Sequence, residues 1–150
     1  MTSTRAPIFA INAINSNSGG GRTIRDGLIA YLRDNTLPEQ FVILAGKSAA
    51  IDLNESEALS IHRVPDSYTR GLLAPFVYGR ALDRVLRKIG ADAVLNLGDL
   101  VIETAIPQAY LFDWSYALDV HEKVWASMTW PDWVQRRYKL RLVRRAIHKP

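Results

Sequence analysis

A chain of 150 residues is long enough for one domain with its own hydrophobic core. Its 48% hydrophobic and 23% charged residues exclude a disordered or fibrous chain, and the lack of cysteine excludes disulfides and thiolate metal sites. Residues 134–150 carry seven basic side chains and no acid, so the other 12 basic and 15 acidic side chains sum to −3. Positive charge confined to one segment argues against a nucleic-acid binder.

The hydrophobic stretches of the chain are all short. The first, residues 8–14, is interrupted by Asn12, and no segment approaches the roughly 20 apolar residues of a membrane span. The N-terminus also lacks the pattern of a secretory signal. We therefore expect a cytoplasmic protein.

The first predicted element is a strand over residues 8–14, where β-branched and aromatic residues dominate. It leads directly into a turn cluster of asparagine, serine and glycine at residues 15–21. From Arg22 onward apolar residues recur at helical spacing, which predicts a helix with Ser18 as a cap and Asn35 as its end.

The rest of the chain continues this alternation of strands and helices. Short apolar runs predict strands over residues 41–45, 93–97 and 109–112. Residues 47–57 are predicted to form a loop, and residues 59–64 another strand, which Pro65 ends. Helical spacing predicts helices over residues 72–89, ended by Gly90, and over residues 133–147. The pattern predicts an α/β fold, a parallel sheet with helices on both faces.

Ligands of such sheets bind beyond the carboxyl ends of the strands, so the loops 15–22, 96–100 and 113–116 are the candidate site. The strongest signal is the run from Ser18 to Arg22, because Gly20 and Gly21 let backbone N–H groups approach a phosphate, with Arg22 and Arg25 adding positive charge. The alternative is a tight turn whose glycines only permit positive φ.

The two later loops carry side chains suited to a sugar. Asp99 can bind a sugar hydroxyl or assist a proton transfer, and Asp113, Trp114 and Tyr116 combine an acid with aromatic faces. Each acid has a structural alternative, because Asp99 or Asp113 can instead cap the segment that follows it. The three histidines are scattered without metal-ligand spacing, and no metal is expected.

The last predicted helix carries most of the positive charge. Its arginines at 137, 141, 144 and 145 share one face, which is either a solvated surface or a contact with anionic lipid head groups. Trp130 and Trp133, just before or within the helix, either pack in the protein or insert at a membrane interface. The membrane interpretation makes this a peripheral protein.

The order of these motifs resembles the N-terminal domain of the family 4 type of retaining glycosyltransferases, whose GT-B arrangement has two Rossmann-like domains. The resemblance rests on the glycine turn 18–22, the segments 90–96 and 106–113, and the arginine-rich helix 136–147. It implies that Gly20, Gly21 and Arg22 lie beside the donor diphosphate, and that Asp99, Trp114 and Tyr116 contact the acceptor or sugar. Asp113 stands where many members have a histidine with a catalytic or sugar-contacting role.

The resemblance implies a single Rossmann-like acceptor-side domain over residues 1–150, with the nucleotide-binding domain outside this chain. The expected function is sugar transfer from a nucleotide-sugar to an acceptor hydroxyl without a further cofactor, and the isolated chain is expected to be inactive. Alternatives are a non-catalytic domain that binds a nucleotide or a partner, and another GT-B-like enzyme such as a sugar epimerase or phosphorylase.

Overall fold

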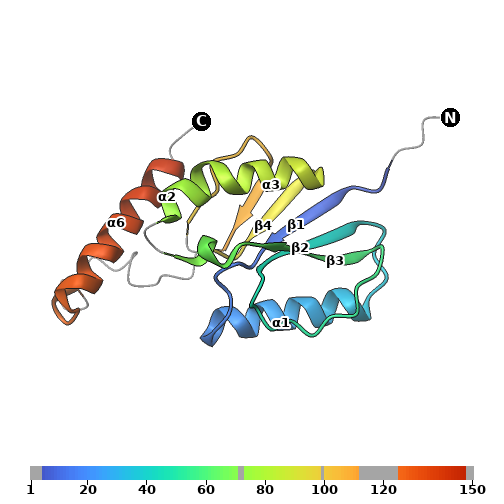
Figure 1. The fold of residues 1–150 in the computed structure, drawn as a ribbon, viewed down its shortest axis with the longest axis horizontal. Coiled ribbons are helices and arrows are strands. Elements are labelled where there is room, and N and C mark those ends of the chain that lie inside the picture. The colour runs from blue at the N-terminus through green and yellow to red at the C-terminus, as the bar shows by residue number, and fades with distance from the viewer. Residues whose placement is uncertain (1–4, 71–72, 99, 112–124, 148–150) are drawn as a thin grey trace.

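The computed structural model describes residues 5–70, 73–98, 100–111 and 125–147 (Figure 1). Its centre is a five-stranded sheet in which every pair of neighbours is parallel, in the order β3-β2-β1-β4-β5. The strands are β1 (Ile8–Asn12), β2 (Gln40–Gly46), β3 (Leu59–Val64), β4 (Ala93–Asn96) and β5 (Gln108–Tyr110). The predicted α/β fold with a Rossmann-like parallel sheet is confirmed.

Both faces of the sheet are covered, which explains why the central strands β1, β2 and β4 are largely apolar without alternation. One core cluster joins Ile11 and Ile43 to Ile29 and Leu32 of helix α1 (Gly19–Asp34). The other joins Ala10, Leu44 and Val94 to the opposite layer, which holds α2 (Ala74–Phe76) and α3 (Leu82–Ile89). Figure 1 shows α1 on one side of the sheet and α2 and α3 on the other.

Helix α1 begins one turn earlier than the sequence predicted. Ser18 is its N-cap, but the glycines that were assigned to the preceding loop form the first turn of the helix. The prediction failed because three glycines have low helix propensity, whereas the N–H groups of a first turn need no partner within the helix. Asn35 ends the helix as predicted, and its side chain donates to the carbonyl of Tyr31 at 2.7 Å.

The predicted helix over residues 72–89 contains a π-helical turn, Val77–Ala81, between α2 and α3. Val77, Tyr78 and Ala81 all face the core, and the carbonyl of Tyr78 accepts a hydrogen bond from Glu103 N at 2.8 Å. Gly90 ends α3 as predicted, in the left-handed conformation at φ 69°. Such π turns are frequent near functional sites, and this one places Tyr78 beside the carboxyl ends of the strands.

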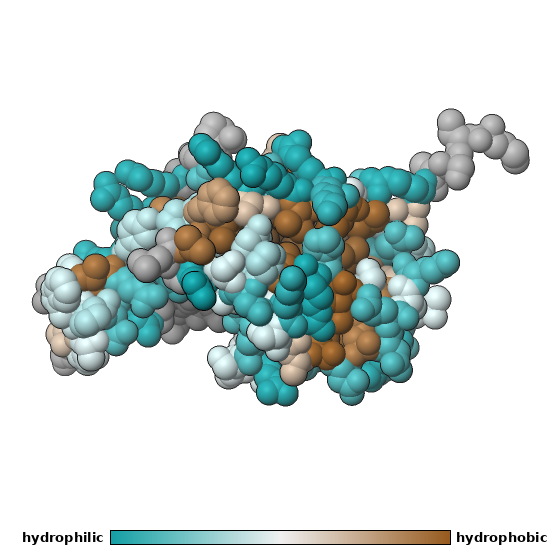
Figure 2. All heavy atoms as spheres, in the orientation of Figure 1, coloured by the Kyte–Doolittle hydropathy of each residue, from teal (hydrophilic) through white to brown (hydrophobic). Residues whose placement is uncertain are grey.

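The connection from β2 to β3 contains no helix. Residues Ile51 and Leu53 of this loop pack on the α1 side of the core and bury surface that a helix would otherwise cover. On the face seen in Figure 2, hydrophobic residues gather over the sheet between α1 and α3, and hydrophilic residues cover the two helices. The loop therefore lies along α1 as part of the same layer.

The last helix, α6 (Trp130–Ile147), starts three residues before the predicted position. Proline is compatible with a first turn, so Pro131 does not prevent this start, and Thr129 hydrogen-bonds to the Asp132 carboxylate at 2.7 Å. Val143 of the C-terminal half is buried in the core beside α2 and α3. The N-terminal half projects from the body near the carboxyl ends of the strands (Figure 1), with Trp130 76% exposed.

Candidate functional site

The site lies where the chain leaves β1 and β4, the two neighbouring strands at the centre of the sheet. From β1 the chain passes through α1 to β2, while from β4 it turns to β5 on the opposite side. Loops that leave in opposite directions open a crevice at the carboxyl ends of the strands. Two of the three predicted loops, residues 15–22 and 96–100, therefore flank one crevice.

A buried asparagine pair holds these two loops together. Asn12 and Asn96 are register partners at the ends of β1 and β4, both 0% exposed, and Asn12 Nδ2 donates to Asn96 Oδ1 at 2.8 Å. Asn96 Oδ1 also accepts from Gly98 N at 3.0 Å, and its Nδ2 donates to the Leu100 carbonyl at 2.7 Å. Asn96 begins the predicted loop 96–100, and these bonds of its side chain fix the geometry of that loop.

Gly98 sits directly against this pair. A Cβ atom built on it would lie 2.3 Å from Tyr78 Oη and 2.8 Å from Asn12 Nδ2. Asn15 of the β1 loop donates to the same Tyr78 hydroxyl at 3.1 Å. The loops after β1 and β4 and the π turn thus meet around one phenol and have no room for another side chain.

The three glycines in the first turn of α1 differ in whether the structure requires a glycine there. Gly19 has φ +55°, which side-chain-bearing residues rarely adopt, and Gly21 packs against Ser16 at 3.5 Å from its virtual Cβ. Gly20 has neither restraint, because its φ is not positive and a Cβ there meets nothing within 4 Å. The alternative that the glycines only permit positive φ therefore accounts for Gly19 alone among the three.

The Ser18 side chain does not cap α1, so among the described residues the first N–H groups of the helix remain available to an outside acceptor. Arg22 does not point at these groups. Its Nε lies 3.3 Å from Asp26 Oδ2 along the helix, and both side chains are about half exposed, at 60% and 45%. An exposed pair of this kind contributes little stability and opens readily.

Arg25 was expected to add positive charge beside the glycine turn, and the structure contradicts this. Its side chain is only 2% exposed and donates to Asn17 Oδ1 at 3.1 Å and to the Ala50 carbonyl at 3.2 Å. It also pairs with Asp26 at 2.7 Å. Burial pushes the pKa of Asp26 up, but the hydrogen bonds and charges of Arg25 and Arg22 outweigh burial and hold that pKa below its usual value.

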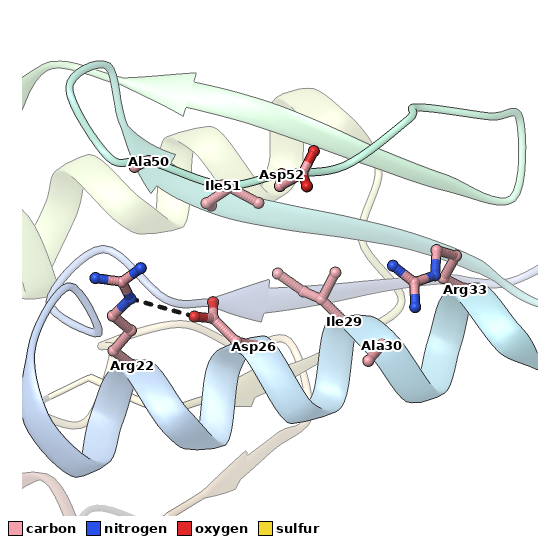
Figure 3. Close-up of a pocket in the computed structure, with 8 residues that line it drawn as sticks. All are labelled: Arg22, Asp26, Ile29, Ala30, Arg33, Ala50, Ile51 and Asp52. Atoms are coloured by element: carbon pink, nitrogen blue, oxygen red, sulfur yellow. Dashed lines mark hydrogen bonds and ion pairs between the residues drawn. The ribbon is translucent and has the colours of Figure 1, made fainter.

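A groove runs between α1 and the loop after β2, with a volume of about 590 Å³ (Figure 3). The positively charged Arg22 and Arg33 lie toward its two ends, and the negatively charged Asp26 and Asp52 lie between them (Figure 3). Ile29 adds an apolar surface to the groove. The alternating charges cancel within the groove. Arg22, predicted to contact the donor, belongs to this groove and not to the crevice at the strand ends.

The crevice itself is a smaller hollow of about 90 Å³ that brings together distant parts of the chain. Asn15 comes from the β1 loop, Arg70 follows β3, Tyr78 comes from the π turn, Leu100 follows β4 and Lys139 comes from α6. Its remaining lining residues are Tyr68, Thr69, Ala74 and Gln135.

Sequence reasoning placed Asn15 and Leu100 in candidate loops but missed the other residues of the crevice. Arg70 could have been predicted from the sequence, because it lies shortly after the end of β3. The predicted site residues lie in the same position relative to β1 and β4. Lys139 was hidden in the arginine-rich helix, although helical spacing places it with Gln135 and Leu142 and away from Arg137 and Arg141.

Several predicted site residues cannot be placed. Asp99, Asp113, Trp114 and Tyr116 lie outside the described residues, as do His121 and His148. Within the described part of the chain, no group of three His, Asp or Glu side chains could hold a metal ion. The same residues contain no helix long and apolar enough to cross a membrane.

Searches of protein-family models, curated proteins and solved structures each found no match.

Proposed function

We propose that this chain is the acceptor-side domain of a glycosyltransferase that moves a sugar from a nucleotide-sugar to an acceptor hydroxyl. The observation that carries the proposal is the uncapped, glycine-rich first turn of α1 beside the central crevice of a parallel sheet ordered β3-β2-β1-β4-β5. The resemblance of its motifs to family 4 glycosyltransferases supplies the reaction. The nucleotide-binding half of the cleft would come from a second domain.

The first turn of α1 would stabilise the donor diphosphate. Its N–H groups and the helix dipole favour an anion, and Gly20 and Gly21 leave the backbone open to close approach. Sugar transfer needs fixed positive charge where the diphosphate leaves. Arg22 would add to it by exchanging its weak pair with Asp26 for the diphosphate, a movement confined to one exposed side chain.

A second candidate is a non-catalytic domain that binds a phosphorylated ligand. The described lining of the crevice contains no carboxylate and no histidine, so it offers groups that bind and none that ordinarily acts as a general base. The two candidates differ in one measurable respect. Only the transferase requires the diphosphate at the glycine turn for turnover.

We expect Gly20→Val to abolish sugar transfer by the complete enzyme while leaving its melting temperature unchanged. The valine side chain would meet no other atom of the protein near its Cβ, but it would occupy the space where the diphosphate approaches the backbone. Gly27→Val is the matched control, because Gly27 lies on the same helix with nothing within 4 Å of its virtual Cβ. Wild-type kcat/KM in Gly20→Val would place the glycine turn away from the donor.

We further propose that α6 contacts anionic membranes. Arg137, Arg141, Arg144 and Arg145 are all exposed, and helical spacing places them with Trp130 on the side opposite the buried Val143. Trp133 is partly buried, and its ring lies 4.9 Å from the Arg137 guanidinium carbon. Trp130 is therefore the tryptophan suited to an interface, with basic residues beside it.

We expect the protein to co-sediment with anionic liposomes at low salt and to lose most binding at physiological salt or with neutral lipid. Each arginine near such a surface contributes about 1 kcal/mol. Arg→Gln at the four α6 positions should remove the binding. The matched control replaces exposed Arg33, Arg80, Arg84 and Arg87, which removes the same charge elsewhere. If both sets of substitutions weaken liposome binding equally, the binding depends on the net charge of the protein and not on α6.

A further inference from the structure

The α6 groove is a hollow between α2 and the N-terminal half of α6, with a volume of about 630 Å³. This volume is in the range of roughly 300–1,000 Å³ that small-molecule sites occupy. Most of its wall is apolar or aromatic, formed by Ala74, Trp130, Pro131, Val134, Tyr138 and Leu142. The α6 groove is therefore suited to an apolar ligand.

One wall of the α6 groove is open to solvent. Trp130, Val134 and Tyr138 follow one another at intervals of about one helical turn, and they are 76%, 40% and 49% exposed. On most helices a row of this kind packs against the core. A contiguous apolar surface that stays exposed marks a place where an apolar ligand or partner binds.

The α6 groove joins the crevice at the carboxyl ends of the strands. Ala74, Gln135 and Lys139 line both hollows. Beyond these three residues the lining changes from apolar to polar, with hydrogen-bonding side chains that include Asn15 and Tyr68. The two hollows form one path, which is apolar between the helices and polar at the strand ends.

This change along the path indicates the shape and chemistry of an occupant. A molecule that fills both parts has a hydrocarbon chain at one end, because burial of methylene groups is favourable. At its other end it has a small polar group, because the crevice offers about 90 Å³ among hydrogen-bonding side chains. A hydroxyl suits this end, since it both donates and accepts hydrogen bonds.

The charges of α6 favour a lipid over a second copy of the chain. Arg137, Arg141 and Arg145 are exposed on the same side of the helix as Trp130 and Val134. Two copies packed through this side would bring their arginines together, and like charges repel. A membrane lipid meets no such repulsion, because the arginines attract the anionic head groups around it.

We propose that the joined α6 groove and crevice bind a lipid, with its hydrocarbon chain between α2 and α6 and its hydroxyl group in the crevice. The binding follows from the two hollows alone. Only the role of the lipid rests on the proposed function, in which it is the acceptor. Its hydroxyl oxygen then bonds to the sugar carbon as the bond from that carbon to the diphosphate breaks, and the hydroxyl proton passes to the departing diphosphate.

The test titrates the isotope-labelled 150-residue chain with 1-hexanol and 1-octanol, dissolved as single molecules, and follows its amide resonances. We expect saturable shifts at residues 134–138 and 68–69. 1-Octanol should bind about tenfold more tightly than 1-hexanol, because two more methylene groups are buried. Equal affinities of the two alcohols would overturn the inference.

Two variants separate the chain from the hydroxyl. Val134→Glu puts a charge in the α6 groove and should weaken 1-octanol binding at least about tenfold. Tyr68→Phe removes a crevice hydroxyl and should weaken both alcohols about threefold, which leaves their ratio unchanged. The matched control is Ile24→Glu on α1, where the exposed fraction of 42% is close to that of Val134. Thermal melting checks that each variant is folded.

Two further results would overturn the inference. Equal weakening by Ile24→Glu and Val134→Glu would mean that the alcohols bind elsewhere. Shifts at residues 130–138 that grow with protein concentration, without alcohol, would put a second copy of the chain in the α6 groove. The titration contains neither donor nor membrane, so its failure leaves sugar transfer and liposome binding standing. Normal activity of Gly20→Val would reject the proposed donor site but leave lipid binding standing.

Discussion

We expect Gly98→Ala to lower the free energy of unfolding by about 2–4 kcal/mol, a large effect for one methyl group. The added Cβ would lie 2.3 Å from Tyr78 Oη and 2.8 Å from Asn12 Nδ2. Relief requires the phenol or the buried amide to move, and either movement disturbs hydrogen bonds that join the two loops. Thermal melting should show a decrease of roughly 5–15 °C.

The matched control for this variant is Gly20→Ala. It adds the same methyl group where nothing lies within 4 Å, so it should melt at or slightly above the wild-type temperature. Tyr78→Phe in the Gly98→Ala background removes the atom that lies nearest and should recover part of the loss. A Gly98→Ala protein that melts like the wild type would show that the loop after β4 adapts freely.

The sheet could be predicted from the sequence because its signals are local. Strand β3 matches the predicted residues 59–64, because a polar loop precedes it and Pro65 ends it. The end of α3 was equally clear, because Gly90 follows the last apolar turn and adopts the left-handed conformation that glycine favours. The alternation of strands and helices then predicts a parallel sheet, but it does not give the order of the strands.

The candidate site was harder to predict, because its contacts join residues far apart in sequence. Asn12 and Asn96 are 84 positions apart and become partners only through the β1 and β4 register. Arg25 follows the glycine run and suggested a phosphate contact, but the loop after β2 provides a carbonyl that binds it internally. Contacts of this kind depend on the strand register and on the path of a loop, and neither can be predicted from a local sequence pattern.

The same long-range contacts give the crevice a fixed shape. The asparagine pair, Gly98 and the Tyr78 hydroxyl fix the loops after β1 and β4, so the crevice keeps its shape without a ligand. A preorganised site loses less conformational entropy on binding than a mobile one. Substitutions in this network should therefore weaken folding and deform the crevice.

We expect Asn96→Leu to destabilise the protein by about 3 kcal/mol or more, which exceeds the effect of most single substitutions. The leucine would leave Asn12 Nδ2, Gly98 N and the Leu100 carbonyl without their partner at the end of β4. Each unpaired buried group costs about 1–3 kcal/mol. Denaturant unfolding measures the loss, and Asn54→Leu in the exposed loop after β2 is the matched control.

The double variant Asn12→Leu/Asn96→Leu separates the asparagine pair from its surroundings. Removing both amides also removes the unpaired Asn12 donor, so the double variant should lose at least about 1 kcal/mol less than the sum of the two single variants. Additive losses would mean that the 2.8 Å contact between the two amides contributes nothing to stability. In that case the bonds from Asn96 to Gly98 and Leu100 would alone hold the loop after β4, and the two loops would be fixed independently.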